Sequence, residues 1–296
     1  YGEILKQQGY DISGFRSQDL SANFLPTENI KIPVDKNNVI ESGLIDEVDR
    51  SLIEDEIIIK IKSQAIYKNR LLMLDIVSNN NWKRPIYFTG GAFSDEDYIW
   101  MKDYLQLDGM CYKLIPIKTK INPQNPYEMG RIDSEKMIDI VKKWSWGNPY
   151  ENNIYLDEES RKNSITYRGN ISRLIKKLII EDKKEKALEL LDLTMKKMPI
   201  EEYGYYTLLE PFIDSYYLLE NNKKARKIYT LVSSKYQEKL FYFSGLSENN
   251  KILYSELIYT NIERYRSLVE TILPYESEEY YKEVLNEFNS YLDLFL

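Results

Sequence analysis

The chain has 296 residues, 43% of them hydrophobic, and a formal net charge of −7 at pH 7. This length predicts two domains with a proper core, and an acidic chain without a long basic stripe argues against a nucleic-acid partner. The absence of histidine and the single cysteine, Cys111, exclude histidine-dependent nucleophiles, an intrachain disulfide and imidazole or thiolate-cluster zinc sites. Any acid–base chemistry would therefore rest on carboxylates, lysine or tyrosine, and no pattern in the sequence identifies a catalytic, cofactor or metal site.

The first part of the chain has a mixed pattern of short elements. Residues 1–55 look irregular, and the run EIIIKIKS at 56–63 is typical of a strand. Residues 67–80 place apolar side chains at helical spacing, and an asparagine run ends this helix. The run RPIYFTG at 84–90 reads as a short buried strand with a proline at its start, where a missing N–H does least harm.

A second helix and a third strand complete this part. Residues 94–109 begin with a serine cap and three carboxylates and end in a glycine, which predicts a helix, and residues 110–118 read as a strand. The order β-α-β-α-β predicts a small parallel sheet with right-handed crossovers. Gly90 and Gly91 either cradle a phosphate or form a tight turn. We favour the turn, because the carboxylates at 95–97 would repel an anion.

From about residue 133 the pattern is nearly all helical. Asp133 can cap the first helix, and two similar units follow, with Ala187 and Ala225 at equivalent positions 38 residues apart. This period is close to the roughly 34 residues of a tetratricopeptide repeat, in which small residues allow paired helices to approach closely. Residues 248–273 and 276–296 predict a further helical hairpin.

These patterns predict a two-part fold: a small α/β module over residues 1–130, followed by TPR-like antiparallel helical hairpins over 131–296. Ala187 and Ala225 should then be buried at helix crossings, and residues 165–240 should contain no strand.

Two groups of side chains are candidate binding residues. Trp82 and Arg84 precede a buried strand and could form a stacking platform for a sugar, a peptide or another domain. The alternative is structural, with Trp82 covering the end of the sheet and Arg84 pairing with a carboxylate at the seam between the domains. Tyrosine is abundant, with 26 residues, and it serves either for packing between helices or as a gripping surface. The tyrosines considered for this surface are Tyr203, Tyr205, Tyr206, Tyr216 and Tyr217.

Four motifs in order carry a family resemblance: LLMLDIVSNNNWKRPIYF, YLQLDGMCYKLIPIK, GRIDSEKM and KWSWGNPYENNIYLDEESRK. Over roughly residues 28–240 the chain resembles the soluble C-terminal region of a family of bacterial multi-pass membrane proteins of unknown function. That family is similar to C-type glycosyltransferases of the protein O-mannosyltransferase kind. The resemblance implies that the donor site and the catalytic acid lie in a membrane portion outside this chain, so no catalytic residue is carried over.

The resemblance also implies a location and partners. The chain starts at Tyr1 rather than methionine, and we expect preceding membrane spans that hold it on the periplasmic or extracytoplasmic face. A polypeptide or glycan acceptor is the expected partner. Three functions remain open: a non-catalytic domain of a membrane glycosyltransferase that presents or recognises protein acceptors, a helical-repeat interaction module of another envelope protein, and a soluble enzyme that uses the α/β module.

Overall fold

A computed structural model of the chain describes residues 28–61, 66, 68–89, 100–121, 128–147 and 154–295. The described residues form two compact units. The first unit takes the described residues of 28–86 together with 100–104 and 114–120, and the second takes 87–89, 105–113 and the described residues from 121 onward. The chain therefore passes between the units more than once, whereas the sequence pattern predicted a single boundary near residue 130.

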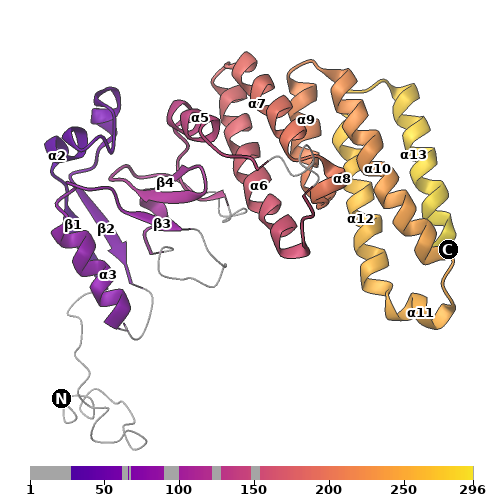
Figure 1. Ribbon diagram of the computed structural model, residues 1–296, viewed down its shortest axis with the longest axis horizontal. Helices are drawn as coiled ribbons and strands as arrows, with labels where there is room; N and C mark the ends of the chain where they lie inside the picture. Colours follow the sequence, from indigo (N-terminus) through magenta and orange to yellow (C-terminus); the bar gives the residue numbers. More distant parts are fainter. Residues whose placement is uncertain are drawn as a thin grey trace, which may run out of the picture. The chain divides into compact units, whose positions relative to one another are not determined.

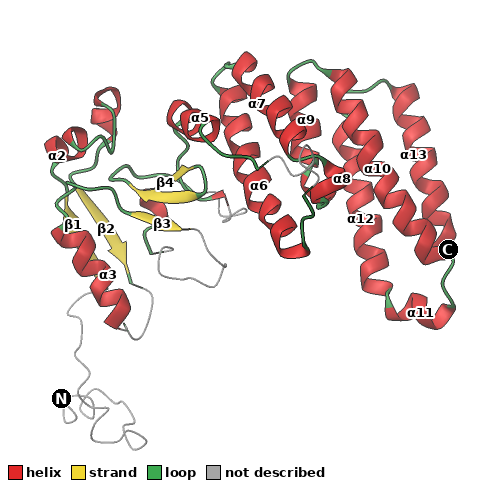
Figure 2. Cartoon of the chain, in the orientation of Figure 1, coloured by secondary structure: helices red, strands yellow, loops and turns green. Residues whose placement is uncertain are grey.

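The first unit is built on a two-stranded antiparallel sheet of β1, Asn29–Pro33, and β2, Glu56–Lys60 (Figure 2). Ile32 lies opposite Ile57, and both side chains are buried. The strand predicted from EIIIKIKS is thereby confirmed. Its alternation of buried and exposed isoleucines is the period-2 pattern of a half-buried strand.

Short helices complete the first unit. Helix α2 spans Lys36–Glu41 and α3 spans Lys68–Asn79, which confirms the helix expected at 67–80. Short 3-10 helices lie at Glu47–Leu52 and Lys102–Tyr104. The 3-10 helix at Lys102–Tyr104 is bonded to β2, because the Tyr104 hydroxyl accepts a hydrogen bond from the backbone N–H of Ile58 at 3.3 Å.

The second unit begins with a three-stranded sheet in the order β3-β5-β4. The strands are β3, Tyr87–Thr89, β4, Leu105–Asp108, and β5, Cys111–Leu114. Strand β3 pairs with β5 in antiparallel fashion. The predicted parallel sheet is therefore wrong, because the strands expected at 84–90 and 110–118 run antiparallel to each other.

The helix expected over residues 94–109 is also partly wrong. Residues 94–99 and the pair Gly90-Gly91 lie outside the described part of the chain, but Leu105–Asp108 form β4. Gly109 has a φ of 66° and leads through a two-residue turn directly into β5. Only glycine adopts this backbone conformation readily, so the residue expected to end a helix instead turns a hairpin.

The rest of the second unit is a stack of helices (Figure 1). Their bounds are α5, Ser134–Lys142; α6, Glu158–Ile180; α7, Lys184–Lys197; α8, Ile200–Tyr203; α9, Glu210–Leu218; α10, Asn222–Ser244; α11, Glu248–Leu253; α12, Ser255–Ile272; and α13, Glu278–Leu292. Asp133 caps α5 as predicted, because its side chain accepts a hydrogen bond from the Lys136 N–H at 3.2 Å. The fold class, a small α/β module followed by helical hairpins, is confirmed.

The two predicted repeats have matching geometry. Helices α6 and α7 are joined by a turn in which Asp182 has a φ of 56°, and α9 and α10 by a turn in which Glu220 has a φ of 59°. Ala187 and Ala225 follow at the same offset, and both are 0% exposed. No strand interrupts residues 165–240. Both conditions that the repeat hypothesis set are therefore met.

Candidate ligand-binding site

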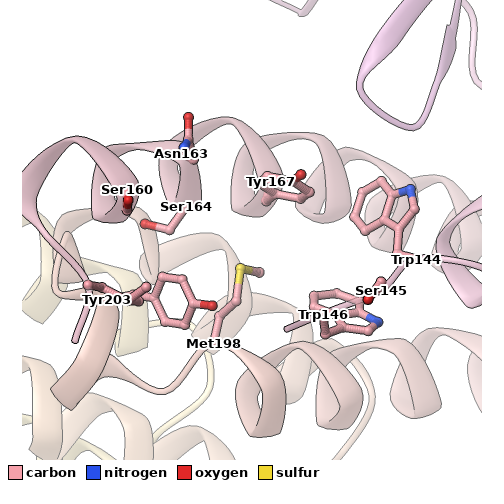
Figure 3. Close-up of a pocket in the computed structure, with 10 residues that line it drawn as sticks. Trp144, Ser145, Trp146, Ser160, Asn163, Ser164, Tyr167, Met198 and Tyr203 are labelled. Atoms are coloured by element: carbon pink, nitrogen blue, oxygen red, sulfur yellow. The ribbon is translucent and has the colours of Figure 1, made fainter. Parts of the chain in front are cut away.

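A cavity of about 270 Å³ lies in the second unit, between the start of α6 and the segments on either side of it (Figure 3). Four stretches of chain form it: the three residues Trp144, Ser145 and Trp146, then Leu156, one face of α6, and the region around α8. Its full lining is Trp144, Ser145, Trp146, Leu156, Ser160, Asn163, Ser164, Tyr167, Met198 and Tyr203. No lining side chain carries a charge.

The α6 face is set by a cap at the start of the helix. The Asp157 side chain accepts a hydrogen bond from the Ser160 N–H at 2.6 Å. This bond lowers the pKa of Asp157 and fixes where α6 begins. Residues 160, 163, 164 and 167 then follow at helical spacing, so one face of α6 presents all four to the cavity.

Aromatic rings form the second wall. The centroids of Trp144 and Trp146 are 5.6 Å apart, and those of Trp144 and Tyr167 are 5.1 Å apart with planes at 87°. These edge-to-face contacts are favourable ring geometries, and they hold each ring in one orientation. Tyr203 and Met198 lie on the opposite side from α6 (Figure 3). The cavity thus offers several rigid rings to an apolar ligand surface.

Ser164 gives the cavity an unused polar group. Ser164 is 1% exposed, and its hydroxyl has no hydrogen-bond partner among the described residues. Other buried helical hydroxyls bond to a carbonyl of the preceding turn: Thr194 donates to Leu190 O at 2.7 Å, and Ser215 to Pro211 O at 2.6 Å. A buried hydroxyl without a partner costs stability. The Ser164 hydroxyl faces the side where Tyr203 and Met198 lie (Figure 3), so a bound ligand could satisfy it.

The chain around α8 is held by a buried cation. Arg168 is 0% exposed, and its guanidinium donates to Gly204 O at 2.6 Å and to Met198 O at 2.9 Å. A longer contact of 3.4 Å reaches Tyr205 O. Gly204 and Tyr205 both have positive φ values, 63° and 47°. Arg168 therefore positions the segment that carries Met198 and Tyr203.

Burial and the charge of Arg168 shift the pKa of Tyr203 in opposite directions. Burial raises the pKa of the Tyr203 hydroxyl, while the charge of Arg168 lowers it and Tyr167 and Glu202 raise it further. Burial also lowers the pKa of Arg168 to about 10, because no solvent stabilises its charge. Both groups keep their ordinary protonation at neutral pH, so Tyr203 presents a neutral hydroxyl to the cavity.

Trp82 and Arg84 lie in the first unit, where Trp82 is buried and Arg84 is exposed. Trp82 is 4% exposed, and its Nε1 donates to Pro33 O at the end of β1 at 2.9 Å. Arg84 is exposed, and its backbone carbonyl accepts a hydrogen bond from Asn80 at 2.7 Å. Trp82 thus covers the end of a sheet, as its structural alternative expected. The seam role proposed for the pair stays a prediction.

The five tyrosines do not share one exposed face. Tyr216 and Tyr217 are 2% and 4% exposed, and they donate to Asp192 and Glu276 at 2.8 and 2.5 Å. Tyr205 is half-buried in the segment that Arg168 holds. The ring of Tyr206 packs edge-on against Tyr236 at 5.0 Å. Tyr203 alone of the five lines the cavity.

Sequence reasoning missed the other walls of the cavity. The motif KWSWGNPY contains Trp144 and Trp146, and two tryptophans so close together in a chain with four were the available indication. Ser164 has no sequence signature, because its missing hydrogen bond exists only in three dimensions. In the described part of the chain, no group of three or more Cys, Asp or Glu side chains could hold a metal ion.

Residues 3–136 match the family model of TMEM260-associated domain 2. The cavity residues, 144–203, lie outside this matched region. No curated protein and no solved structure matches the chain. None of the helices among the described residues combines the length and the apolar character that crossing a membrane requires. The chain is thus similar over its first 136 residues to a domain associated with TMEM260.

Proposed function

We propose that the chain is a non-catalytic domain of a TMEM260-like membrane protein and that it recognises protein or glycan acceptors on the extracytoplasmic face. The family match over residues 3–136 supports the association with such a protein. The resemblance of the sequence motifs to the soluble region of glycosyltransferase-like membrane proteins supports the rest. In this proposal the sugar-transfer chemistry belongs to another part of the full-length protein.

The observation that carries the binding role is the cavity with its aromatic walls and unsatisfied hydroxyl. Rigid rings such as Trp146 and Tyr203 contact the apolar face of a sugar or a peptide with little loss of conformational entropy. Ser164 and Asn163 add a few polar groups that fix orientation. Concave sites of this composition are typical of small-ligand binding.

The same lining favours binding over chemistry. General acid–base catalysis needs a side chain that gives or takes a proton near neutral pH, such as a carboxylate or an amine. The ten lining residues carry tryptophan, tyrosine, serine, asparagine, leucine and methionine side chains. We therefore expect that the purified chain does not turn over a lipid-linked sugar donor in the presence of acceptor peptides.

Tryptophan fluorescence tests the proposal directly, since two of the four tryptophans line the cavity. The chain is titrated with two neutral probes, methyl glucoside and N-acetyl-phenylalanyl-asparagine amide. We expect a saturable emission change with at least one probe, and a roughly tenfold weaker affinity, about 1.4 kcal/mol, in Trp146→Ala.

The matched control is Tyr155→Ala. Tyr155 is 86% exposed and lies next to Leu156, but it does not line the cavity. This variant should keep the wild-type affinity. The proposal fails if neither probe gives a saturable change, or if Tyr155→Ala weakens binding as much as Trp146→Ala does.

A further inference from the structure

Arg168 is a buried cation that has no carboxylate partner among the residues that the structure describes. Its side chain is fully buried on α6, and in the described part of the chain its guanidinium bonds to backbone carbonyls alone, those of Met198, Gly204 and Tyr205. Its Nε has no partner. Buried charges are normally paired with an opposite charge. Carbonyl dipoles solvate a guanidinium but do not cancel its charge, so a net positive charge stays inside the helical unit.

This charge lies beside the cavity. The carbonyls that Arg168 holds belong to Met198, which lines the cavity, and to Gly204, which follows the lining residue Tyr203. One turn earlier on the same helix is Ser164, with its unpartnered hydroxyl. A buried charge is screened far less than an exposed one. The field of Arg168 therefore acts on whatever occupies the space between α6 and α8.

A second guanidinium lies on the same side of α6, where the carboxylate of Asp157 offsets part of its charge. Arg161 lies seven residues before Arg168, two turns away on the same side of α6. Its Nε is also buried and has no partner in the part of the chain that the structure describes.

The carboxylates of Glu158 and Glu159 at the start of α6 have side chains that are 73% and 80% exposed. Glu159 also pairs with Lys162 at 2.6 Å. Water and this pairing weaken the opposing field of the two glutamates. Glu202 on α8 also opposes it, because its charge acts on the lining residue Tyr203. Attraction of an anion into the cavity therefore requires that the buried charge of Arg168 outweighs Glu202.

We propose that the cavity takes a ligand in which a carboxylate adjoins a ring. The ring lies against the aromatic wall, and the carboxylate accepts a hydrogen bond from Ser164 in the field of Arg168. This inference rests on the proposed function, because it uses the same cavity. It specifies that the acceptor recognised by the chain carries a carboxylate. Two sources have this chemistry: a uronic acid of a glycan, and an acidic side chain beside an aromatic residue in a polypeptide.

Two ligand pairs separate the sources and isolate the charge. Methyl glucuronoside is compared with methyl glucoside, and N-acetyl-phenylalanyl-aspartate amide with its asparagine analogue. Both members of each pair have similar shape and differ by one negative charge. We expect the anionic member of at least one pair to bind about tenfold more tightly at neutral pH, because opposite charges attract strongly across a partly buried site. The pair that shows the preference identifies the source.

Two variants test whether the tighter binding of the anionic ligand depends on Arg168. Arg168→Met removes the charge and should abolish the anionic preference, while Arg168→Lys keeps the charge and should retain a preference. Circular dichroism establishes whether each variant folds. If Arg168→Met does not fold, the comparison of ligand pairs on the wild-type chain decides the matter.

The outcomes distinguish this inference from the proposed function. If the neutral probes bind and the anionic ones bind no better, the inference is overturned and the proposed function stands. If no probe binds, both fail. If folded Arg168→Met keeps the full preference for the anion, the charge acts from elsewhere and the inference is overturned.

Discussion

Arg226→Met should destabilise the helical unit by about 2 kcal/mol, because it leaves a buried carboxylate without its cation. Arg226 on α10 donates through Nε and Nη2 to the two carboxylate oxygens of Glu276, at 2.7 and 2.6 Å. The Glu276 side chain is 1% exposed, whereas that of Arg226 is 49% exposed. Breaking a fully buried pair costs about 3–5 kcal/mol and an exposed pair contributes about 1 kcal/mol or less, so a half-exposed arginine falls between them.

The effect should depend on pH in a definite direction. The Arg226 hydrogen bonds, aided by the Tyr217 hydroxyl, hold the pKa of Glu276 below its ordinary value. A carboxylate with a lowered folded-state pKa contributes stability at neutral pH and loses this contribution as the pH falls through the lowered value. The difference between wild type and Arg226→Met should therefore be full at pH 7 and shrink below about pH 4.

Urea unfolding followed by circular dichroism measures both effects. The control is Lys227→Met, which removes the same charge from the next residue of α10, where the side chain is exposed. Its effect should stay within about 0.5 kcal/mol. The reasoning is refuted if Arg226→Met costs no more than Lys227→Met at pH 7, or if its cost is equally large at pH 3.

Two further substitutions test the packing of the second unit. Ala225→Leu inserts bulk at a position that is 0% exposed and should cost about 1–3 kcal/mol in urea unfolding, whereas Lys223→Leu on the exposed face of α10 should be nearly neutral; equal effects would remove the close helix crossing. Gly109→Ala would place a Cβ 2.9 Å from Ile140 Cγ2 at a φ of 66°. This variant should lower the melting temperature more than Gly147→Ala does, because Gly147 has a similar φ but no atom of the described residues within 4 Å of its Cβ position. A larger shift for Gly147→Ala would contradict this.

The helical part of the fold was predictable because its information is local. The Asp133 cap and the turns at Asp182 and Glu220 lie within a few residues of the helices that they begin or end. The small residues Ala187 and Ala225 recur at a fixed period, which marks the repeat without knowledge of its neighbours. Local periodicity and capping therefore suffice for helical hairpins.

The sheets were predicted in part, because strand pairing depends on distant residues. The alternation in YLQLDG and the dipeptide Asp108-Gly109 are together a hairpin pattern. The three carboxylates at 95–97 are typical of the first turn of a helix, and they led to the prediction of a helix in place of this hairpin. The structure shows that the turn at Gly109 decides the local path, since its backbone conformation brings β5 back directly after β4.

Burial of the tyrosines on α9 could not be predicted from periodicity. Tyr216 and Tyr217 are neighbours in sequence and point in different directions from the helix, which usually places one of them at the surface. Both are buried here because α9 packs against α6 and α7 as well as α10 and α12. The number of helices that surround an element is a property of the whole stack, and a local sequence pattern does not contain it.

The last prediction concerns the hydroxyl that the cavity leaves unsatisfied. Ser164→Ala removes a buried group that has no hydrogen-bond partner. Deleting such a group should leave the free energy of unfolding unchanged or raise it by up to about 1 kcal/mol, because its desolvation cost disappears. The matched control is Ser215→Ala, since Ser215 is also 1% exposed but donates to Pro211 O. That variant should lose about 1 kcal/mol.

Stability and binding should therefore change in opposite directions at Ser164. Proteins commonly give up stability where a group is kept for function, so Ser164→Ala should bind the acidic probes more weakly while it unfolds at an equal or higher urea concentration. Ser215→Ala should show the reverse, with lower stability and unchanged affinity. If Ser164→Ala is destabilised as much as Ser215→Ala and binds the probes like the wild type, the hydroxyl belongs to the packing of α6, and the cavity loses its main polar contact with a ligand.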